Sequence, residues 1–155
     1  MALLDQLQQD ASLTNQALAE RVHVSPPTCL RRVKRLVDAG LVERQVAILD
    51  RDRLARLAGY GLDAVAEITL DRQDDAAMAA FEAKVVAEAA VQQCYRVSPG
   101  PDFILVVHAP DMPGYLALAQ RLFTADANVR NVKAFFAVKR AKFDPRLVLP
   151  RPARG

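Results

Sequence analysis

The chain has few of the residues that build metal centres and disulfide frameworks. Its 155 residues include no tryptophan, two cysteines and two histidines. Cys29 and Cys94 have neither a CxxC motif nor a cysteine–histidine cluster beside them, so we expect no disulfide framework and no metal site. Both cysteines are interpreted as small apolar core residues. The chain also lacks a run of about 18 apolar residues and a signal-peptide core, which predicts a soluble, cytoplasmic protein with no membrane partner.

The motifs of common catalytic sites are missing as well. We find no Gly-rich phosphate loop, no Ser/His/Asp set and no carboxylate pair with catalytic spacing. His23 and His108 fall in different predicted domains. We therefore expect no catalytic residues, no cofactor and no enzyme activity.

Positive charge is scarce overall but unevenly distributed. The formal net charge is only +3, which is too small to indicate a nucleic-acid partner by itself. Residues 25–40, however, hold four basic side chains against one acid, and residues 141–155 hold four against one. Residues 61–140 are slightly acidic, with 8 basic and 10 acidic side chains. A basic segment at one end of the chain is typical of a DNA-binding module.

Two short helices with a tight turn are predicted near the N-terminus. Thr14 is a candidate cap for a helix over 15–22, and Ser25 and Pro26 are favourable residues for starting the next one. The turn between them has three residues, as in a helix-turn-helix. Its first position is His23, a residue type that tolerates positive φ.

The second helix has one apolar side and one basic side. At about 100° per residue, the predicted apolar side comprises Cys29, Leu30, Val33, Leu36 and Val37. The opposite face comprises Thr28, Arg31, Arg32 and Arg35. A helix of this kind fits the major groove of double-stranded DNA. The alternative is an ordinary helix pair with a solvated basic face.

Gly40 can end this helix, and the β-branched character of 41–49 predicts a strand. Residues 1–49 are therefore interpreted as a winged helix-turn-helix, in which Arg44 can reach the DNA backbone. Residues 50–61 are interpreted as a charged linker.

Beyond residue 61 the pattern predicts a βαββαβ domain over 62–149. Strands are expected at 62–70, 91–97, 103–108 and 129–138, with helices at 74–88 and after Asp111. This order is ferredoxin-like, so the fold class is α+β with helices on one face of a sheet. Tyr95, Val97 and Phe135 leave the other face apolar, which predicts self-association. Residues 150–155 are expected to form a mobile tail.

The whole arrangement resembles the Lrp/AsnC (feast/famine) transcriptional regulators. The motifs that carry the resemblance include Leu18-Ala-Glu-Arg-Val22, Val24-Ser-Pro-Pro-Thr-Cys-Leu-Arg-Arg-Val-Lys-Arg-Leu36, Asp38-Ala-Gly-Leu-Val42, Val97-Ser98 and Asp102-Phe103. The resemblance implies DNA contacts by Ser25, Thr28, Arg31, Arg32 and Arg35. It also implies a RAM (ACT-like) second domain that dimerises through its sheet, assembly of dimers into octamers, and an amino-acid effector.

The predicted effector loop departs from the family pattern. Members usually read Gly-Asp-x-Asp-Tyr after the segment corresponding to Val97-Ser98, whereas this chain reads Pro99-Gly-Pro-Asp-Phe103. The resemblance implies effector contacts by Ser98, Gly100, Asp102 and Phe103. Asp102 can pair with an effector's ammonium group or simply close the loop, and the sequence leaves both roles open.

Two other functions share the predicted architecture. Sirohaem decarboxylases resemble it, but they carry His-Asn-Tyr-Arg where this chain has Gln93-Cys-Tyr-Arg96, so the histidine is missing. A module that only assembles, with a DNA head that no longer binds, is the third alternative. The four clustered basic residues of 31–35 disfavour it.

Overall fold

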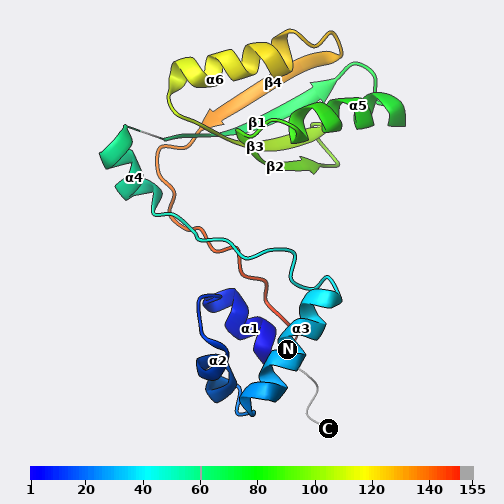
Figure 1. The fold of residues 1–155 in the computed structure, drawn as a ribbon. Coiled ribbons are helices and arrows are strands. Elements are labelled where there is room, and N and C mark those ends of the chain that lie inside the picture. Colours follow the sequence, from blue (N-terminus) through cyan, green and yellow to red (C-terminus); the bar gives the residue numbers. More distant parts are fainter. Residues whose placement is uncertain (60, 151–155) are drawn as a thin grey trace. The chain divides into compact units, whose positions relative to one another are not determined.

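The protein, a computed structural model in which residues 1–59 and 61–150 are described, consists of two compact units. The first unit combines Met1–Ile48 with the chain from Lys142 onward, and the second is Leu49–Ala141. In Figure 1 the chain passes from the first unit into the second, forms the whole of it, and then runs back to the first unit. The first unit is therefore made from two separate segments of the sequence.

Three short helices pack around a small apolar core in the first unit. They are α1 (Ala2–Gln9), α2 (Asn15–Arg21) and α3 (Pro26–Asp38). The buried residues of this core are Leu3, Leu18, Ala19 and Cys29. Cys29 is fully buried, which confirms its predicted core role. The boundaries agree with the predicted helices because caps and apolar periodicity coincide at each helix.

The strand predicted for 41–49 is not formed. Residues 42–50 carry no helix or strand, and Val46, Ile48 and Leu49 are all exposed. Their β-branched and aliphatic side chains favour extended backbone, but a strand also needs a neighbouring strand to accept its backbone hydrogen bonds. The wing is therefore an extended segment, and Arg44 lies within it.

The predicted linker 50–61 is largely a helix, α4 (Arg51–Ala58). Asp50 caps it by accepting a hydrogen bond from the Arg53 backbone N–H at 3.0 Å, and Gly59 ends it at φ +63°. The Arg51 guanidinium donates to the Asp63 carboxylate at 2.6 Å, which attaches α4 to the sheet. A charged segment with both a cap and a glycine stop has the signals of a helix, so the predicted linker contains one, and its role as a linker stays a prediction.

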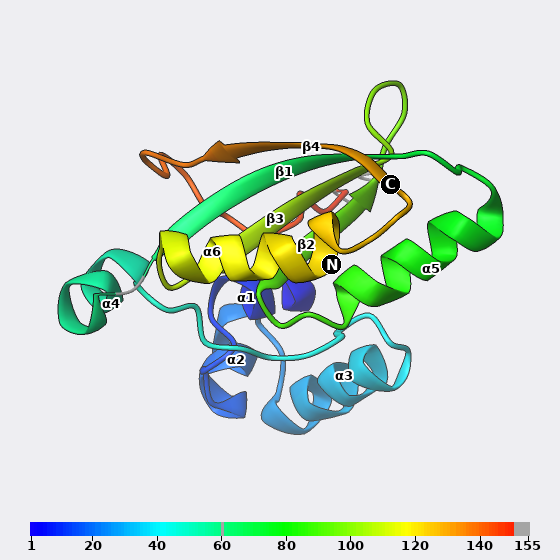
Figure 2. The ribbon, with the colours of Figure 1, turned by 90° about the horizontal axis from the view of Figure 1, so that it is seen from above.

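The second unit is a four-stranded antiparallel sheet with helices on one face (Figure 2). Its strand order is β2-β3-β1-β4. The strands are β1 (Leu62–Leu70), β2 (Val91–Arg96), β3 (Phe103–Ala109) and β4 (Val129–Phe136). The helical layer is α5 (Asp75–Val86), α6 (Met112–Ala119) and the π turn η1 (Gln120–Thr124). The predicted ferredoxin-like βαββαβ fold is confirmed.

The core of this unit lies between the sheet and its helices. Alternate residues of β1 and β3 face the helices and are buried, while the residues between them face the other side. The rings of Phe81 and Phe103 lie 5.0 Å apart, and Tyr115 meets Phe136 edge-on at 4.9 Å. In the helix predicted after Asp111, the apolar side chains Tyr115, Leu118, Leu122 and Phe123 are buried, and their row continues from α6 into η1. The apolar pattern therefore continues across the π turn.

The opposite face of the sheet exposes large apolar side chains. Tyr95 is 52% exposed and Phe135 46%, and Val65 is also exposed. Strand pairing places Val65 opposite Phe135, and Tyr95 opposite Ile104, on this side. Val97, predicted on the same face, follows the end of β2 and is partly buried.

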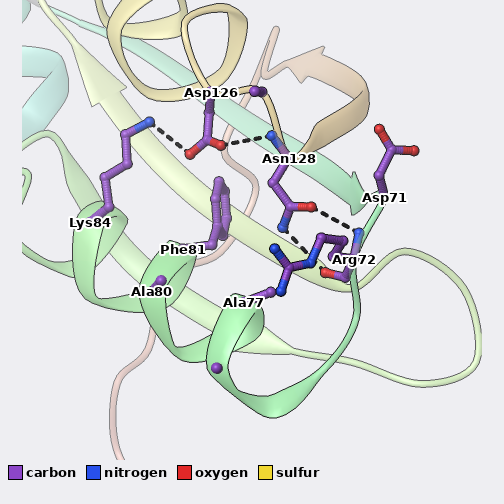
Figure 3. Close-up of a pocket in the computed structure, with 10 residues that line it drawn as sticks. Asp71, Arg72, Ala77, Ala80, Phe81, Lys84, Asp126 and Asn128 are labelled. Atoms are coloured by element: carbon purple, nitrogen blue, oxygen red, sulfur yellow. Dashed lines mark hydrogen bonds and ion pairs between the residues drawn. The ribbon is translucent and has the colours of Figure 1, made fainter.

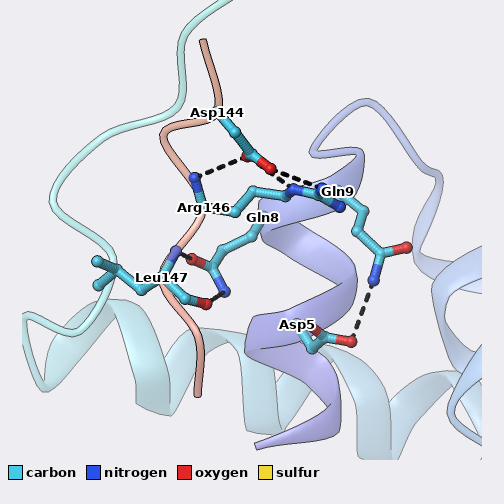
Figure 4. A network of polar contacts seen from close by, with 6 residues as sticks. All are labelled: Asp5, Gln8, Gln9, Asp144, Arg146 and Leu147. Carbon is cyan, nitrogen blue, oxygen red and sulfur yellow. Dashed lines mark hydrogen bonds and ion pairs between the residues drawn. The ribbon is translucent and has the colours of Figure 1, made fainter. Parts of the chain in front are cut away.

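The predicted second domain, residues 62–149, extends past the last strand of the sheet. β4 ends at Phe136, and Lys142 to Pro150 group with the first unit instead. The Gln8 side chain explains this, because its amide donates to the Leu147 carbonyl at 3.3 Å and accepts from the Leu147 N–H at 2.7 Å (Figure 4). Of the predicted mobile tail 150–155, residues 151–155 lie outside the described residues. Among those described, no helix has the length and apolarity needed to cross a membrane.

Candidate nucleic-acid interface

The turn between α2 and α3 is set by backbone hydrogen bonds around His23. Thr14 caps α2 by accepting from the Ala17 N–H at 3.2 Å. At the other end His23 adopts φ +54°, and the Val24 N–H donates to the Ala19 carbonyl at 3.0 Å. This is a Schellman closure with histidine in the position that usually holds glycine. The predicted positive φ at His23 is confirmed.

The start of α3 is tied to α2 by a residue that the sequence did not single out for this role. The Asn15 side chain donates from Nδ2 to the Pro26 carbonyl at 2.9 Å, joining the first residues of the two helices. Ser25 occupies the N-cap position, but its hydroxyl donates to Thr28 Oγ1 at 2.9 Å and caps no backbone N–H. The capping hydrogen bond expected of Ser25 is therefore not made.

Helix α3 ends in a second Schellman closure. Gly40 adopts φ +68°, the Gly40 N–H donates to the Val37 carbonyl at 2.9 Å, and the Leu41 N–H donates to the Leu36 carbonyl at 3.0 Å. The predicted glycine stop is confirmed. Because both ends of α3 are fixed, the direction of its solvent face is fixed as well.

The buried side of α3 is narrower than the apolar pattern suggests. Cys29 is fully buried, and Val33 and Leu36 pack partly buried beside it. Leu30 and Val37, predicted on the same side, are 61% and 47% exposed. α1 and α2 are too short to cover a wider stripe, so these two side chains stay on the flank.

The basic face of α3 is open to solvent. Arg31, Arg32, Lys34 and Arg35 are all exposed, and within residues 1–59 and 61–150 none of their side chains makes a hydrogen bond or ion pair. Guanidinium groups bind phosphates and the guanine edge through paired donors. The three arginines of this face can therefore supply both kinds of contact, and Lys34 adds a further positive charge at its edge.

The remaining predicted DNA-contacting residues differ in their surroundings. Ser25 is exposed at the start of α3, whereas Thr28 is partly buried and accepts the Ser25 hydroxyl. The Arg44 side chain is 76% exposed on the extended wing and lies 3.8 Å from Glu43. A contact this long and exposed leaves Arg44 available to phosphate.

The predicted effector loop is organised by Asp102. Its Oδ2 accepts from the Leu70 backbone N–H at 2.7 Å and from Gln73 Nε2 at 3.2 Å. The Asp102 backbone N–H donates to the Ile68 carbonyl at 2.8 Å. The carboxylate therefore joins the loop to the end of β1, which is the loop-closing role that the sequence left open.

The other residues of this loop fall into two environments. Ser98 and Gly100 are exposed, and Gly100 adopts φ +127°, a conformation that favours glycine. Phe103 is fully buried against Phe81. Its side chain packs in the core, so a ligand at the loop would meet only its backbone.

A cavity of about 680 Å³ lies between α5 and the loop before β4 (Figure 3). Its polar groups already bind one another. Lys84 donates to Asp126 and to the Leu122 carbonyl, each at 2.9 Å, and the Asn128 amide brackets the Arg72 backbone. Burial raises the pKa of Asp126, but the Lys84 and Asn128 hydrogen bonds outweigh it, so the net pKa is lowered. We interpret this cavity as a gap between packed elements whose polar groups hold those elements together.

Metal-ligating side chains do not gather at either place. In the part of the chain that the structure describes, no group of three His, Cys, Asp or Glu residues could hold a metal ion. The polar groups exposed on the first unit are cations, amides and hydroxyls.

Known proteins with similar sequences and structures are DNA-binding regulators. Residues 1–43 match a winged helix-turn-helix DNA-binding family, and residues 63–147 match the Lrp/AsnC ligand binding domain. A leucine-responsive regulatory protein of Rhizobium meliloti is 34% identical over 142 residues, covering 92% of this chain and 88% of the relative.

Two solved structures have the same fold over almost their whole length. An AsnC family transcriptional regulator from Agrobacterium tumefaciens matches with a TM-score of 0.85 and 26% identity, covering 95% of this chain and 93% of the other. A transcriptional regulator of Neisseria meningitidis, solved in complex with L-Met, matches with a TM-score of 0.84 and 29% identity, covering 95% and 92%. None of these three proteins is named as an enzyme, so the comparison gives no support to the decarboxylase alternative. The chain belongs to the Lrp/AsnC family of transcriptional regulators.

Proposed function

We propose that this protein regulates transcription by placing α3 in the major groove of double-stranded DNA. The observation that carries the proposal is the row of exposed cations on α3, which have no partner in the described part of the chain. Side chains on such a face lose no intramolecular ion pair when they bind phosphate. This makes binding to polyanionic DNA favourable and strongly dependent on salt.

The six proposed DNA contacts have different roles. Arg31, Arg32 and Arg35 reach phosphates or guanine edges, and each bidentate contact to a base contributes about 1–3 kcal/mol of discrimination. Ser25 and Thr28 contribute hydroxyls at the start of the helix. Arg44, on the wing, contacts the DNA backbone, which positions the protein without reading sequence.

The test is a fluorescence-anisotropy titration on duplexes from the region upstream of the coding sequence, repeated at several salt concentrations. We expect Arg31→Ala/Arg35→Ala to abolish the preference for one duplex over a mixed-sequence duplex, with oligomeric state unchanged. The matched control is Arg72→Gln/Arg121→Gln, which removes two exposed charges from the second unit. If wild type and the α3 variant bind alike, the basic face is not the interface.

The second unit is proposed to assemble the protein and to sense an amino acid. The exposed apolar sheet face supports a homodimer, and family resemblance supports assembly of dimers into octamers. The complex of the Neisseria meningitidis relative with L-Met supports an amino-acid effector. We place its site at the loop of Ser98, Gly100 and Asp102, with the Phe103 backbone at the edge.

Calorimetric titration with L-Met and a panel of other amino acids tests this site. Gly100→Gln is expected to weaken binding, because a residue with a side chain is strained at φ +127° and shifts the loop backbone. Loss of binding with an unchanged oligomer supports the assignment, and wild-type affinity in the variant contradicts it.

A regulator of this kind needs no catalytic activity, and we propose none for this protein. It would act on chromosomal DNA in the cytoplasm. Absorbance titration with sirohaem checks the enzyme alternative, and we expect no spectral change.

A further inference from the structure

We propose that Arg51 and Asp63 are positioning residues for DNA binding, because they limit how far the DNA-binding unit can swing on its connections to the sheet. They belong to a polar cluster of Arg51, Asp63, Gln92 and His108, which is called here the Asp63 clamp. All four residues lie in the second unit. The inference rests on the proposed DNA binding by a dimer and adds residues that control the spacing of its two α3 helices.

The clamp joins the first residue of α4 to three neighbouring strands. Arg51 donates from Nη1 to the Asp63 carboxylate of β1 at 2.6 Å, and from Nη2 to the Gln92 amide oxygen of β2 at 2.5 Å. His108 of β3 lies directly opposite Asp63 in the sheet, and its Nδ1 is 2.6 Å from the same carboxylate oxygen. A guanidinium with two acceptors on two strands is held in position and in direction. The start of α4 is therefore fixed to the sheet.

These contacts are shielded from solvent. The side chains of Arg51 and Asp63 are 28% and 27% exposed, and that of His108 is 12% exposed. A partly buried ion pair is screened by salt much less than a surface pair. The clamp should therefore persist at the salt concentrations used for DNA binding.

The backbone of Asp63 holds the second connection between the units. The chain passes between them before Leu49 and again after Ala141 (Figure 1). Arg51 follows the first crossing, and the two residues from Leu49 to Arg51 span at most about 7 Å. Ala137 precedes the second crossing by four residues, or at most about 14 Å, and its N–H donates to the Asp63 carbonyl at 2.8 Å. Asp63 therefore fixes both connections, one through its side chain and the other through its backbone.

Two short connections restrict rotation of the first unit more than one does. If Arg51 is released, α4 becomes free chain, and the first unit can turn about the remaining connection. In a dimer, the two α3 helices must meet equivalent positions of the duplex, about one helical turn of 34 Å or a multiple of it apart. Freer rotation lowers the effective concentration of the second α3 helix after the first has bound. The clamp therefore favours binding by both helices at once.

Hydrogen exchange of the full chain tests the clamp itself. Arg51→Ala is expected to speed exchange of the α4 amides, because a helix of this length is not stable without tertiary contacts. The matched control is Arg53→Ala, which removes an arginine of the same helix whose side chain is 78% exposed and pairs with Asp50 at 3.3 Å. Alanine favours helix in both variants. Wild-type exchange of α4 in Arg51→Ala would overturn the proposal.

Fluorescence anisotropy then tests the effect on DNA binding, with mixed-sequence duplexes of about 12 and 30 base pairs, roughly one and three helical turns. The measured quantity is the ratio of the affinity for the longer duplex to that for the shorter one. Arg51→Ala is expected to lower this ratio about tenfold, whereas Arg53→Ala should leave it unchanged. General destabilisation or simple loss of charge would weaken both duplexes alike. An unchanged ratio in Arg51→Ala would contradict the positioning role.

A double-mutant cycle tests whether the two residues act through one contact. Asp63→Asn should lower the ratio as Arg51→Ala does, and the double variant should lower it no further. Additive losses would show that the residues act separately and would overturn the clamp. If wild type binds neither duplex, the proposed function fails, and the exchange measurement, which needs no DNA, still decides whether the clamp holds α4.

Discussion

Replacing Phe135 by serine should separate the dimer without unfolding the protomer. Phe135 lies on the uncovered face of the sheet with 46% of its surface exposed. An aromatic side chain has about 200 Å² of surface that can be buried, so about 90 Å² of the Phe135 surface remains for a partner to cover. At about 25 cal/mol per Å² this corresponds to about 2 kcal/mol for each copy.

In a two-fold symmetric dimer each substitution is present in both subunits, so its effect on the interface occurs twice. The Phe135→Ser dimer should therefore lose about 4–5 kcal/mol, which raises its dissociation constant about a thousandfold. Sedimentation velocity over a range of protein concentrations measures the shift directly. Far-ultraviolet circular dichroism should be unchanged, because the side chain lies outside the core.

Leu116→Ser is the matched control. Leu116 is 60% exposed on α6, in the helical layer on the other side of the sheet, and we expect it to leave dimerisation intact. A Phe135→Ser protein that still sediments as wild type would refute the assignment of the sheet face. A Leu116→Ser protein that dissociates would place the interface on the helices instead.

Three further predictions concern stability. His23→Gly should raise the melting temperature of the first unit, with a gain of about 0.5–1 kcal/mol from relief of positive φ; a lower melting temperature would contradict the Schellman assignment. Burial raises the pKa of Asp63, but hydrogen bonding to His108 and the charge of Arg51 outweigh it, so the net pKa is lowered. The Asp63 carboxylate should therefore stabilise the fold above its unfolded pKa of about 4, and this stabilisation should be lost as pH falls through its folded pKa. In urea unfolding, the free energy of Asp63→Asn should accordingly depend less on pH below about 4 than that of wild type. An unchanged pH dependence would show that Asp63 does not contribute. Deleting residues 142–155 should destabilise the first unit because α1 loses its Leu147 hydrogen bonds, and hydrogen exchange of α1 amides would reveal this by faster exchange, whereas wild-type protection would refute it.

Local signals predicted most of the helices and strands. Thr14, Asp74 and Asp111 each accept a backbone N–H at the start of a helix, as their positions indicate. Gly40 ends α3, and the alternation along β1 matches its burial. These features depend on neighbours within a few residues, and for that reason the sequence shows them plainly.

The errors arose where distant partners decide the structure. The segment 41–49 has strand-forming residues but no strand beside it, and whether Leu30 is covered depends on the lengths of α1 and α2. The attachment of Leu147 to Gln8 joins residues 139 positions apart, and no local pattern reports such a pairing. The helix within the predicted linker 50–61 has local signals, since Asp50 caps it and Gly59 ends it.

The candidate site was predicted with similar limits. The exposure of Arg31, Arg32 and Arg35 follows from helical periodicity, which a sequence contains. The role of Asp102 does not, because its partners Leu70 and Gln73 come from another strand and the loop after it. The burial of Phe103 likewise depends on Phe81 across the core.

The two-segment construction of the first unit matters during synthesis on the ribosome. Chains generally fold from the N-terminus as they emerge, but part of the first unit, from Lys142 onward, is synthesised after the entire sheet. A nascent or prematurely terminated product therefore carries three helices without the segment that completes them.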